Sequence, residues 1–385
     1  MFSHCWKVPF VIQGLNVLIN MFFIFRVDSS YDIGTGHIMR CVTLANALRK
    51  AGHECSFICK QHAGNISQFV LDNDFEVHEL EVSESEDYSA CSGNIEPLSH
   101  RSWLGSSVEH DAHRTNKILE KNLPDWMIVD HYGIDVSWHV MVRKNLGKIM
   151  VIDDLADRHH DCDMLLDQNL GASIDKYRKL VPSESEFCLG PTYALLRPEF
   201  YDFRELSLSN KNSGDLRRIF INFGGGDNLG LTEKVLKKLS KVTFINDVQI
   251  DVVLGPQVSS DVNLTSTIAK FDGQVNVFKN IKNMAEVMMM SDLAISAGGS
   301  TSWERCALGL PSMIFSVASN QDKMIENMVS HGIGVALTES SLSNGEFEAS
   351  LETFFCRDVL KSYSKAAANV TDGGGVRMIV SKLND

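Results

Sequence analysis

Short apolar runs alternate with amphipathic helical stretches along most of this chain, and this alternation narrows the possible folds more than any other feature. Alternating strand and helix signals are typical of βα units on a parallel sheet. In a first series we predict strands at 21–26, 54–59, 74–79, 126–130 and 148–153 and helices at 37–51, 61–73, 111–122 and 137–146. In a second series we predict strands at 218–223, 248–254, 275–278, 292–296, 311–315 and 333–337 and helices at 229–241, 281–290, 301–308, 321–330 and 357–369.

The two series predict two domains, which a chain of 385 residues is long enough to form. The polar stretch 207–214 has the composition of a linker, so we place the domains at 21–206 and 207–385. The expected fold class is α/β, with two Rossmann-like doubly wound domains that face a central cleft. Ligands bind outside the carboxyl ends of strands in such domains. The polar segment 82–110 is expected to be a long loop or insertion.

The charge balance limits the kinds of partner that the chain can have. Its 36 basic and 49 acidic residues give a net charge of −13. Because no basic tract neutralises phosphates, we expect no nucleic-acid partner. Nine cysteines without zinc spacing fit a reducing, cytoplasmic compartment. The crowded run His159-His160-Asp161-Cys162-Asp163 resembles a metal site, but no second cluster completes a tetrahedron, so we expect no metal.

Residues 1–20 form a moderately apolar extension that contains a lysine, a glutamine and two asparagines. It lacks a small-residue cleavage site and is too interrupted for a membrane span, so we expect no stable membrane association. Met21 directly precedes the apolar run Phe22-Phe-Ile-Phe25 of the first predicted strand. We therefore hypothesise that translation starts at Met21, which mass spectrometry of the native N-terminus would test.

The segment 296–304, Ser-Ala-Gly-Gly-Ser-Thr-Ser-Trp-Glu, follows a predicted strand and opens a predicted helix. Exposed N–H groups at a helix start bind anions, and Gly298 and Gly299 let the backbone approach a phosphate. Glu304 lies one turn further on, where it can accept hydrogen bonds from a ribose diol. The alternative is a capping box with Thr301 as N-cap and Glu304 as its partner.

A second glycine turn follows strand 21–26, in the segment from Arg26 to Cys41 that contains Asp28, Gly34 and Gly36. His37 falls in the first turn of the helix that follows. A helix N-terminus disfavours the imidazolium, which leaves a neutral ring able to act as a general base. The alternative is a histidine that only makes local hydrogen bonds.

Polar groups also follow strand 126–130, in Asp130-His131-Tyr132-Gly133. We expect the first three side chains to project toward one rim of the cleft. Tyr132 can both stack on a sugar ring and hydrogen-bond to it. The alternative for Asp130 is a cap of the next helix or a loop anchor.

The second series carries two further motifs. Phe223-Gly-Gly-Gly-Asp-Asn228 places Gly225 and Asp227 after a strand, where phosphate or sugar contact competes with a simple glycine turn. Ala318-Ser-Asn-Gln-Asp322 offers Asn320 and Gln321, whose amides suit hydroxyl and N-acetyl groups. Asn320 is equally suited to be the N-cap of the helix that follows.

Together these motifs resemble the UDP-2,4-diacetamido-2,4,6-trideoxy-β-L-altropyranose hydrolase family of pseudaminic acid biosynthesis. The resemblance runs from about Met21 to the C-terminus. Besides the motifs above it includes Trp103-Leu-Gly, Asp111-Ala112, Val151-Ile-Asp-Asp-Leu-Ala-Asp-Arg-His159, Gly190-Pro-Thr-Tyr-Ala-Leu-Leu-Arg-Pro-Glu-Phe200 and Asp372-Gly-Gly-Gly-Val-Arg377.

The resemblance implies a GT-B architecture like that of the MurG-type glycosyltransferases, with no metal or cofactor. It implies a UDP-sugar substrate that is hydrolysed by water attack at the anomeric carbon, releasing UDP and free sugar for surface or flagellar glycans. The implied site residues are His37 as catalytic base, with Arg26, Asp28, Gly36, Tyr132, Gly225, Asp227, Gly299, Ser300, Thr301, Glu304, Asn320 and Gln321 in substrate binding. The N-terminal domain would then hold the sugar and the C-terminal domain UDP.

Two other functions stay open. A UDP-sugar-dependent glycosyltransferase would share the nucleotide half and differ in its acceptor, and a non-catalytic sugar-nucleotide binding protein would lack turnover. Because one hydroxyl configuration can decide specificity, the motifs do not distinguish between UDP-diacetamido sugars. They also do not indicate an oligomeric state.

Overall fold

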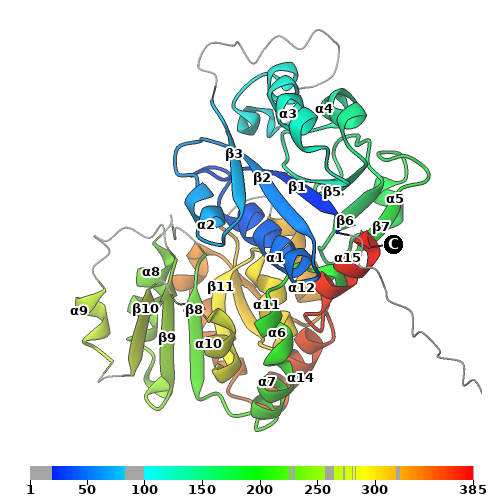
Figure 1. The fold of residues 1–385 in the computed structure, drawn as a ribbon. Helices are drawn as coiled ribbons and strands as arrows, with labels where there is room; N and C mark the ends of the chain where they lie inside the picture. The colour runs from blue at the N-terminus through cyan, green and yellow to red at the C-terminus, as the bar shows by residue number, and fades with distance from the viewer. Residues whose placement is uncertain are drawn as a thin grey trace, which may run out of the picture.

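Two parallel sheets form the centres of two bodies that lie against each other (Figure 1). The structure is a computed structural model, and it describes residues 20–82, 99–224, 227, 230–255, 264–271, 274–279, 281, 283–317 and 321–384. Among these residues, no helix combines the length and the apolar character needed to cross a membrane. The sheets confirm the predicted α/β class with two Rossmann-like units.

The first body is built on seven strands. They are β1 (Phe22–Val27), β2 (Glu54–Lys60), β3 (Glu76–Leu80), β4 (Trp126–Asp130), β5 (Lys148–Ile152), β6 (Met164–Asp167) and β7 (Glu186–Leu189), in the order β3-β2-β1-β4-β5-β6-β7. The helical segments between them are α1 (Gly36–Lys50), α2 (Ser67–Leu71), η1 (Arg101–Leu104), α3 (Val108–Asn122), α4 (Val136–Val142), η2 (Arg143–Asn145) and α5 (Ile174–Tyr177).

Helices cover both faces of this sheet. Phe23 and Phe25 of β1 pack in one apolar core with α1, while Ile24 between them packs in a second core with α3 and α4. Side chains alternate between the faces of a strand, so a strand buried on both sides reads as a continuous apolar run. This is why the sequence Phe22-Phe-Ile-Phe25 predicts a central parallel strand.

The second body is built on six strands. They are β8 (Arg218–Asn222), β9 (Gln249–Leu254), β10 (Val275–Lys279), β11 (Leu293–Ala297), β12 (Ser312–Phe315) and β13 (Gly334–Leu337), in the order β10-β9-β8-β11-β12-β13. Its helical segments are α8 (Leu231–Leu239), η4 (Thr243–Ile245), α9 (Thr265–Ile268), α10 (Met284–Met290), α11 (Thr301–Ala307), α12 (Asp322–Ser330), η6 (Glu339–Leu342), α13 (Glu346–Thr353) and α14 (Arg357–Ala368).

The chain passes between the bodies twice. The first passage carries η3 (Pro191–Tyr193), α6 (Pro198–Asp202) and α7 (Arg204–Lys211). The second leads from α14 to α15 (Gly375–Leu383) through a turn in which Gly373 has φ +83°. In Figure 1 the red α15 lies on the upper body beside the blue α1, and its apolar residues join the core of Phe25. The first body is thus completed by the end of the chain, and residues 207–385 do not lie wholly in the second.

The expected linker 207–214 is largely helical. It begins inside α7, where Ser207 Oγ donates to the carbonyl of Leu308 at 2.8 Å. Lys211 Nζ in turn donates to Ser207 Oγ at 2.7 Å. Both polar side chains are buried against the second body, so this stretch is a packed connection rather than a flexible one.

Candidate active site

A cavity of about 280 Å³ lies between the two bodies, beyond the carboxyl ends of strands from both sheets. The first body contributes Ile33, Gly36, His37, Arg40, Tyr132, Asp154, Leu155, Gln168 and Asn169, and the second contributes Gly298, Gly299, Ser300, Trp303, Gln321 and Met324. A Cβ added to Gly36 would lie 3.7 Å from Ser300 Oγ, so the two walls approach closely here.

His37, in the first turn of α1, is held by a buried acid from the neighbouring strand. Its Nδ1 lies 2.6 Å from Oδ1 of Asp130. Asp130 ends β4, which pairs with β1, so the two strand ends bring the residues together. Arg40 lies one helical turn beyond His37 and donates to both carboxylate oxygens of Asp130, each at 2.6 Å.

The charge on Asp130 fixes what the imidazole can do. Burial would raise the pKa of Asp130, but the Arg40 guanidinium and His37 hold it well below its usual range. An ionised carboxylate only accepts hydrogen bonds, so it places the proton of a neutral His37 on Nδ1. The Nε2 lone pair is then available to take a proton from a water molecule in the cavity.

Tyr132 forms the neighbouring part of this wall. The edge of its ring meets His37 at 4.8 Å between centroids, and Trp103 stacks on it at 5.7 Å. Its hydroxyl donates to the carboxylate of Asp154. Burial and the Asp154 charge raise the pKa of Tyr132, so it stays a neutral hydroxyl.

Of Asp130, His131 and Tyr132, which were all expected at the rim, only Tyr132 lines the cavity. Asp130 is buried and contacts His37, whereas His131 faces another part of the interior. It is buried, and its Nδ1 accepts from the Gly133 N–H at 3.0 Å. The proton of a neutral ring is therefore on Nε2, which lies 3.1 Å from Oδ2 of Asp28. His131 faces inward because this contact holds the loop after β4 to the end of β1.

Arg26 and Asp28, both expected to bind substrate, lie in the interior and do not line the cavity. Arg26 pairs with Asp28 at 2.6 Å and with Asp111 of α3 at 2.9 Å. Lys60 also lies 2.9 Å from Asp111. Because buried charges need partners, this network explains the charged residues at the end of β1 without a ligand.

The second wall combines the backbone of a glycine turn with the uncharged side chains of Ser300, Trp303, Gln321 and Met324. Gly298 and Gly299 follow β11, and a Cβ on Gly299 would meet no atom within 4 Å, so its backbone faces open space. Ser300 is the N-cap residue of α11 and has no side-chain capping bond. Main-chain N–H groups at such a turn can hydrogen-bond to a phosphate.

Glu304 lines a smaller recess beside the cavity, together with Gly36 and Ser300. Its Oε1 lies 3.5 Å from Arg197 Nη2 on the first passage between the bodies. Burial raises the pKa of Glu304, and Arg197 opposes this rise. The capping-box alternative is wrong, because Thr301 is the first residue of α11, Ser300 is its N-cap and no side chain caps this helix. The Thr301 hydroxyl accepts a hydrogen bond from Arg305 at 3.2 Å.

The remaining expected site residues differ in position. Gln321 lines the cavity, and Oε1 of its side chain accepts from the Val317 N–H at 3.3 Å. Asp227 caps α8 instead, accepting from the N–H groups of Leu231 at 2.9 Å and Thr232 at 3.1 Å. Gly225 and Asn320 lie outside the described residues.

Several cavity residues were not foreseen from the sequence, namely Arg40, Asp154, Gln168, Asn169 and Trp303. Asp154 follows β5, which was predicted, and Gln168 follows β6, which was not. The rule that ligands bind beyond strand ends therefore indicates Asp154 directly, and Gln168 only once β6 is recognised. Gln168 Oε1 accepts from the Leu195 N–H at 3.2 Å. Within the described ranges, no group of three His, Cys, Asp or Glu side chains could hold a metal ion.

The chain is similar in sequence to one family model and to several known proteins. Residues 219–372 match the glycosyltransferase family 28 C-terminal domain. A UDP-2,4-diacetamido-2,4,6-trideoxy-β-L-altropyranose hydrolase of Campylobacter jejuni is 29% identical over 276 residues, which cover 71% of this chain and 84% of that protein. An uncharacterized protein of Methanocaldococcus jannaschii is 29% identical over 293 residues, 74% of this chain, but the match spans only about half (54%) of the archaeal protein.

Solved structures show the architecture. MurG of Acinetobacter baumannii superposes with a TM-score of 0.68 at 12% identity, covering 94% of this chain and 99% of MurG. The calicheamicin glycosyltransferase CalG4 gives a TM-score of 0.55 at 12% identity, covering 95% of this chain and 98% of CalG4. The chain therefore has a GT-B-like fold.

Proposed function

We propose that this protein hydrolyses a UDP-2,4-diacetamido-2,4,6-trideoxyhexose to UDP and the free sugar, as in nonulosonate biosynthesis of the pseudaminic acid type. The observation that carries the proposal is the pair formed by His37 and ionised Asp130, 2.6 Å apart, at a cavity whose opposite wall is the turn Gly298–Ser300. The likeness to the Campylobacter hydrolase supports the choice of substrate.

In this reaction the His37 Nε2 lone pair takes a proton from water while the water oxygen bonds to the anomeric carbon. The bond between that carbon and the diphosphate oxygen breaks, and its electron pair leaves with UDP. Asp130 stabilises the imidazolium that forms, and the backbone N–H groups after β11 stabilise the charge that develops on the diphosphate. Tyr132 and Gln321 would orient the sugar, and Glu304 would accept hydrogen bonds from the ribose.

A UDP-sugar-dependent glycosyltransferase is the second candidate, because residues 219–372 match a glycosyltransferase domain. In that reaction an acceptor hydroxyl replaces the water. The two functions differ in one measurable property: a hydrolase releases UDP from its donor with no acceptor present, whereas a transferase is nearly idle. A non-catalytic binding protein would bind UDP and release none.

The test is incubation with a panel of UDP-diacetamido sugars, following free UDP and the anomer of the released sugar. His37→Ala should keep its affinity for UDP and lose turnover by roughly 10²-fold or more, since a general base contributes about that factor. His331→Ala, an exposed histidine at the end of α12, is the matched control and should leave turnover unchanged. Full turnover by the His37 variant would remove this histidine from the mechanism.

A further inference from the structure

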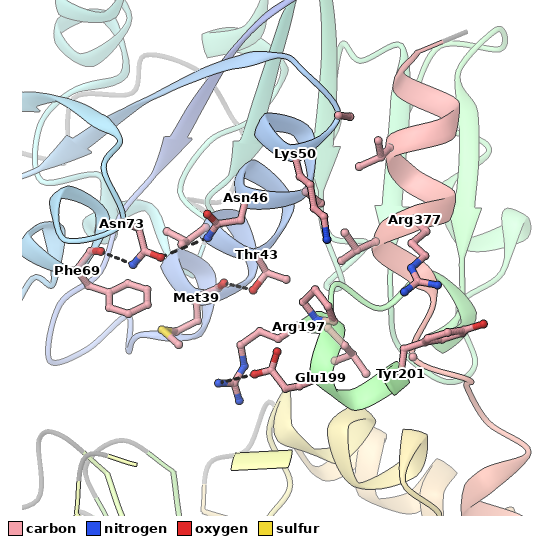
Figure 2. A pocket seen from close by; sticks show the side chains of 18 residues that line it. Met39, Thr43, Asn46, Lys50, Phe69, Asn73, Arg197, Glu199, Tyr201 and Arg377 are labelled. Carbon is pink, nitrogen blue, oxygen red and sulfur yellow. Dashed lines mark hydrogen bonds and ion pairs between the residues drawn. The ribbon is translucent and has the colours of Figure 1, made fainter. Parts of the chain in front are cut away.

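A cavity larger than that of His37 lies outside the candidate active site. It is a groove of about 840 Å³ between α1, α2, the first passage and α15, which we call the hinge groove (Figure 2). Both passages between the bodies border it, the first through Arg197–Tyr201 and the second through Gly373 and Arg377. Its volume is within the range of small-molecule sites.

The hinge groove has an apolar floor with polar groups above it. One stripe of α1 supplies Met39, Val42, Thr43, Asn46, Ala47 and Lys50, at the spacing of three and four residues that keeps side chains on one face of a helix. Val376 and Val380 of α15 and Phe69 of α2 add apolar surface. An occupant therefore needs an apolar body.

The charges around this floor favour an anion. Three cations, Lys50, Arg197 and Arg377, line the groove from three different elements, against the single carboxylate of Glu199. Figure 2 shows these cationic side chains around the same central space. This positive lining occurs in a protein whose net charge is −13, so it is a local feature and not an average property of the surface.

The cations are held in different ways. Arg197 pairs with Glu199 at 3.2 Å, so its charge is largely balanced. Arg377 lies over the ring of Tyr201 at 4.1 Å and reaches Asp202 only at 3.6 Å, with both partners of this ion pair more than half exposed. Arg377 and Lys50 therefore remain the groups that can meet a charged ligand from opposite sides of the groove.

The groove adjoins the cleft but is separate from it. Met39, Thr43, Leu196 and Arg197 also border the recess that contains Glu304, whereas none of the groove residues lines the cavity of His37. A ligand over Lys50 and Arg377 would lie along α1 toward its C-terminal end, away from Gly36 at its start. The groove can thus be filled while the cleft holds a nucleotide.

We propose that the hinge groove is a binding site for a small amphipathic anion, with an apolar or aromatic body on α1 and α15 and a carboxylate, sulfonate or phosphate between Lys50 and Arg377. This site is occupied independently of UDP. The proposal does not depend on which reaction the cleft performs.

The test uses a dye of this chemistry, 8-anilinonaphthalene-1-sulfonate, and its uncharged analogue N-phenyl-1-naphthylamine, with fluorescence as the readout on the folded full chain. The sulfonate should bind saturably and more tightly than the neutral dye. The double variant Lys50→Glu/Arg377→Glu should weaken sulfonate binding about tenfold or more, because opposed charges replace two attractive ones, and should leave the neutral dye nearly unaffected. Arg178→Glu, an exposed arginine on the first body, is the matched charge control and should change neither.

Three results would overturn the proposal. One is unchanged sulfonate binding in the double variant, and another is an equal loss in Arg178→Glu, which would mean a non-specific charge effect. The third is competitive displacement of the sulfonate by UDP, which would make the groove part of the nucleotide site. Both variants change exposed side chains, and their melting temperatures and UDP affinities should match those of the unchanged protein. If charge reversal lowers the melting temperature, Lys50→Gln/Arg377→Gln takes its place in the test. This variant should weaken sulfonate binding by less than the charge-reversed variant, and unchanged binding would again overturn the proposal.

Discussion

The two walls of the cleft differ in the chemical groups that they present to the cavity. The wall from the first body presents His37 and Arg40, and each is joined by a hydrogen bond of 2.6 Å to the buried carboxylate of Asp130. The wall from the second body presents the backbone of Gly298 and Gly299 and side chains that carry no charge, namely Ser300, Trp303, Gln321 and Met324.

This difference fits two different tasks. Moving a proton requires a group with a defined protonation state and orientation, which a desolvated network of charges provides. Holding a diphosphate requires several donors that never change protonation, which backbone N–H groups provide. The comparison predicts that stability, pH dependence and proton transfer depend on the first wall, and that nucleotide affinity depends on the second.

The largest effect is expected at Asp130. Asp130→Asn removes the negative partner of the buried Arg40 guanidinium and should lower the free energy of unfolding by about 3–5 kcal/mol in urea denaturation. Turnover should fall too, because the amide no longer fixes the tautomer of His37. Asp175→Asn, which breaks an exposed pair with Arg178, should cost less than about 1 kcal/mol. Equal costs at the two sites would mean that the first wall does not depend on buried charge.

A pH-dependent effect is expected at Asp167, at the end of β6. Burial raises its pKa to about 7, and the nearby carboxylates of Asp154 and Asp153 add to the rise. Between about pH 4 and pH 7 the folded state therefore holds a proton that the unfolded state has released, and stability falls as the pH rises through this window. Asp167→Asn should remove this loss. Its free energy of unfolding, relative to that of the unchanged protein, should therefore rise by up to about 4 kcal/mol as the pH increases from 4 to 8.

Urea denaturation of both proteins across that range measures this difference, with Asp175→Asn as the exposed control. A stability gap that is constant with pH, or that closes toward high pH, would contradict a raised pKa at Asp167.

A smaller effect, on affinity alone, is expected in the second wall. Glu304→Ala should raise the dissociation constant for UDP by an amount equivalent to about 1–3 kcal/mol, because a ribose diol would lose its acceptor. Glu199→Ala is a close control, since Glu199 also pairs with Arg197 but does not line the recess at Ser300. Isothermal titration calorimetry gives the dissociation constant of each variant for UDP. If Glu304→Ala leaves this constant unchanged, Glu304 has a structural role only.

The smallest effect is expected at Tyr132. Tyr132→Phe loses the hydroxyl that donates to Asp154 but keeps the ring stacked on Trp103. Because the Asp154 side chain is 16% exposed, water can replace the lost donor, and we expect a loss of about 1 kcal/mol in kcat/KM. Tyr201→Phe, outside the cleft, should leave kcat/KM unchanged. A loss of 10²-fold or more would instead give the hydroxyl a direct part in the reaction.

The sequence predicts the fold better than it predicts the site. Apolar runs buried on both faces, such as Phe22–Phe25, identify parallel strands, and the glycine turns at Gly36 and Gly299 are correctly placed at strand ends. The short strands β6 and β7 were not predicted. In α7 the partners of Ser207 and Lys211 lie 101 and 78 residues away, beyond the reach of local composition.

The errors at the site have the same origin. The family resemblance implies that Arg26 and Asp28 bind substrate, but Asp111, 85 residues further along, neutralises Arg26 in the interior. Asp130 was expected to project toward the cleft rim, with a helix cap or loop anchor as the alternative, and its partner His37 lies 93 residues earlier. A charged residue beyond a strand end is a candidate for the site, and only its distant partners decide whether it faces the ligand.

Because α15 returns to the first body, this body is built from segments at both ends of the polypeptide, with the second body between them in the sequence. Proteolytic nicking near residue 214 should leave two fragments that stay associated, because Ile379 and Leu383 remain buried beside α1. A fragment that ends before Gly375 would instead expose the apolar surface of α1 to solvent and tend to aggregate. Expressing the first body alone would require grafting the terminal helix onto it.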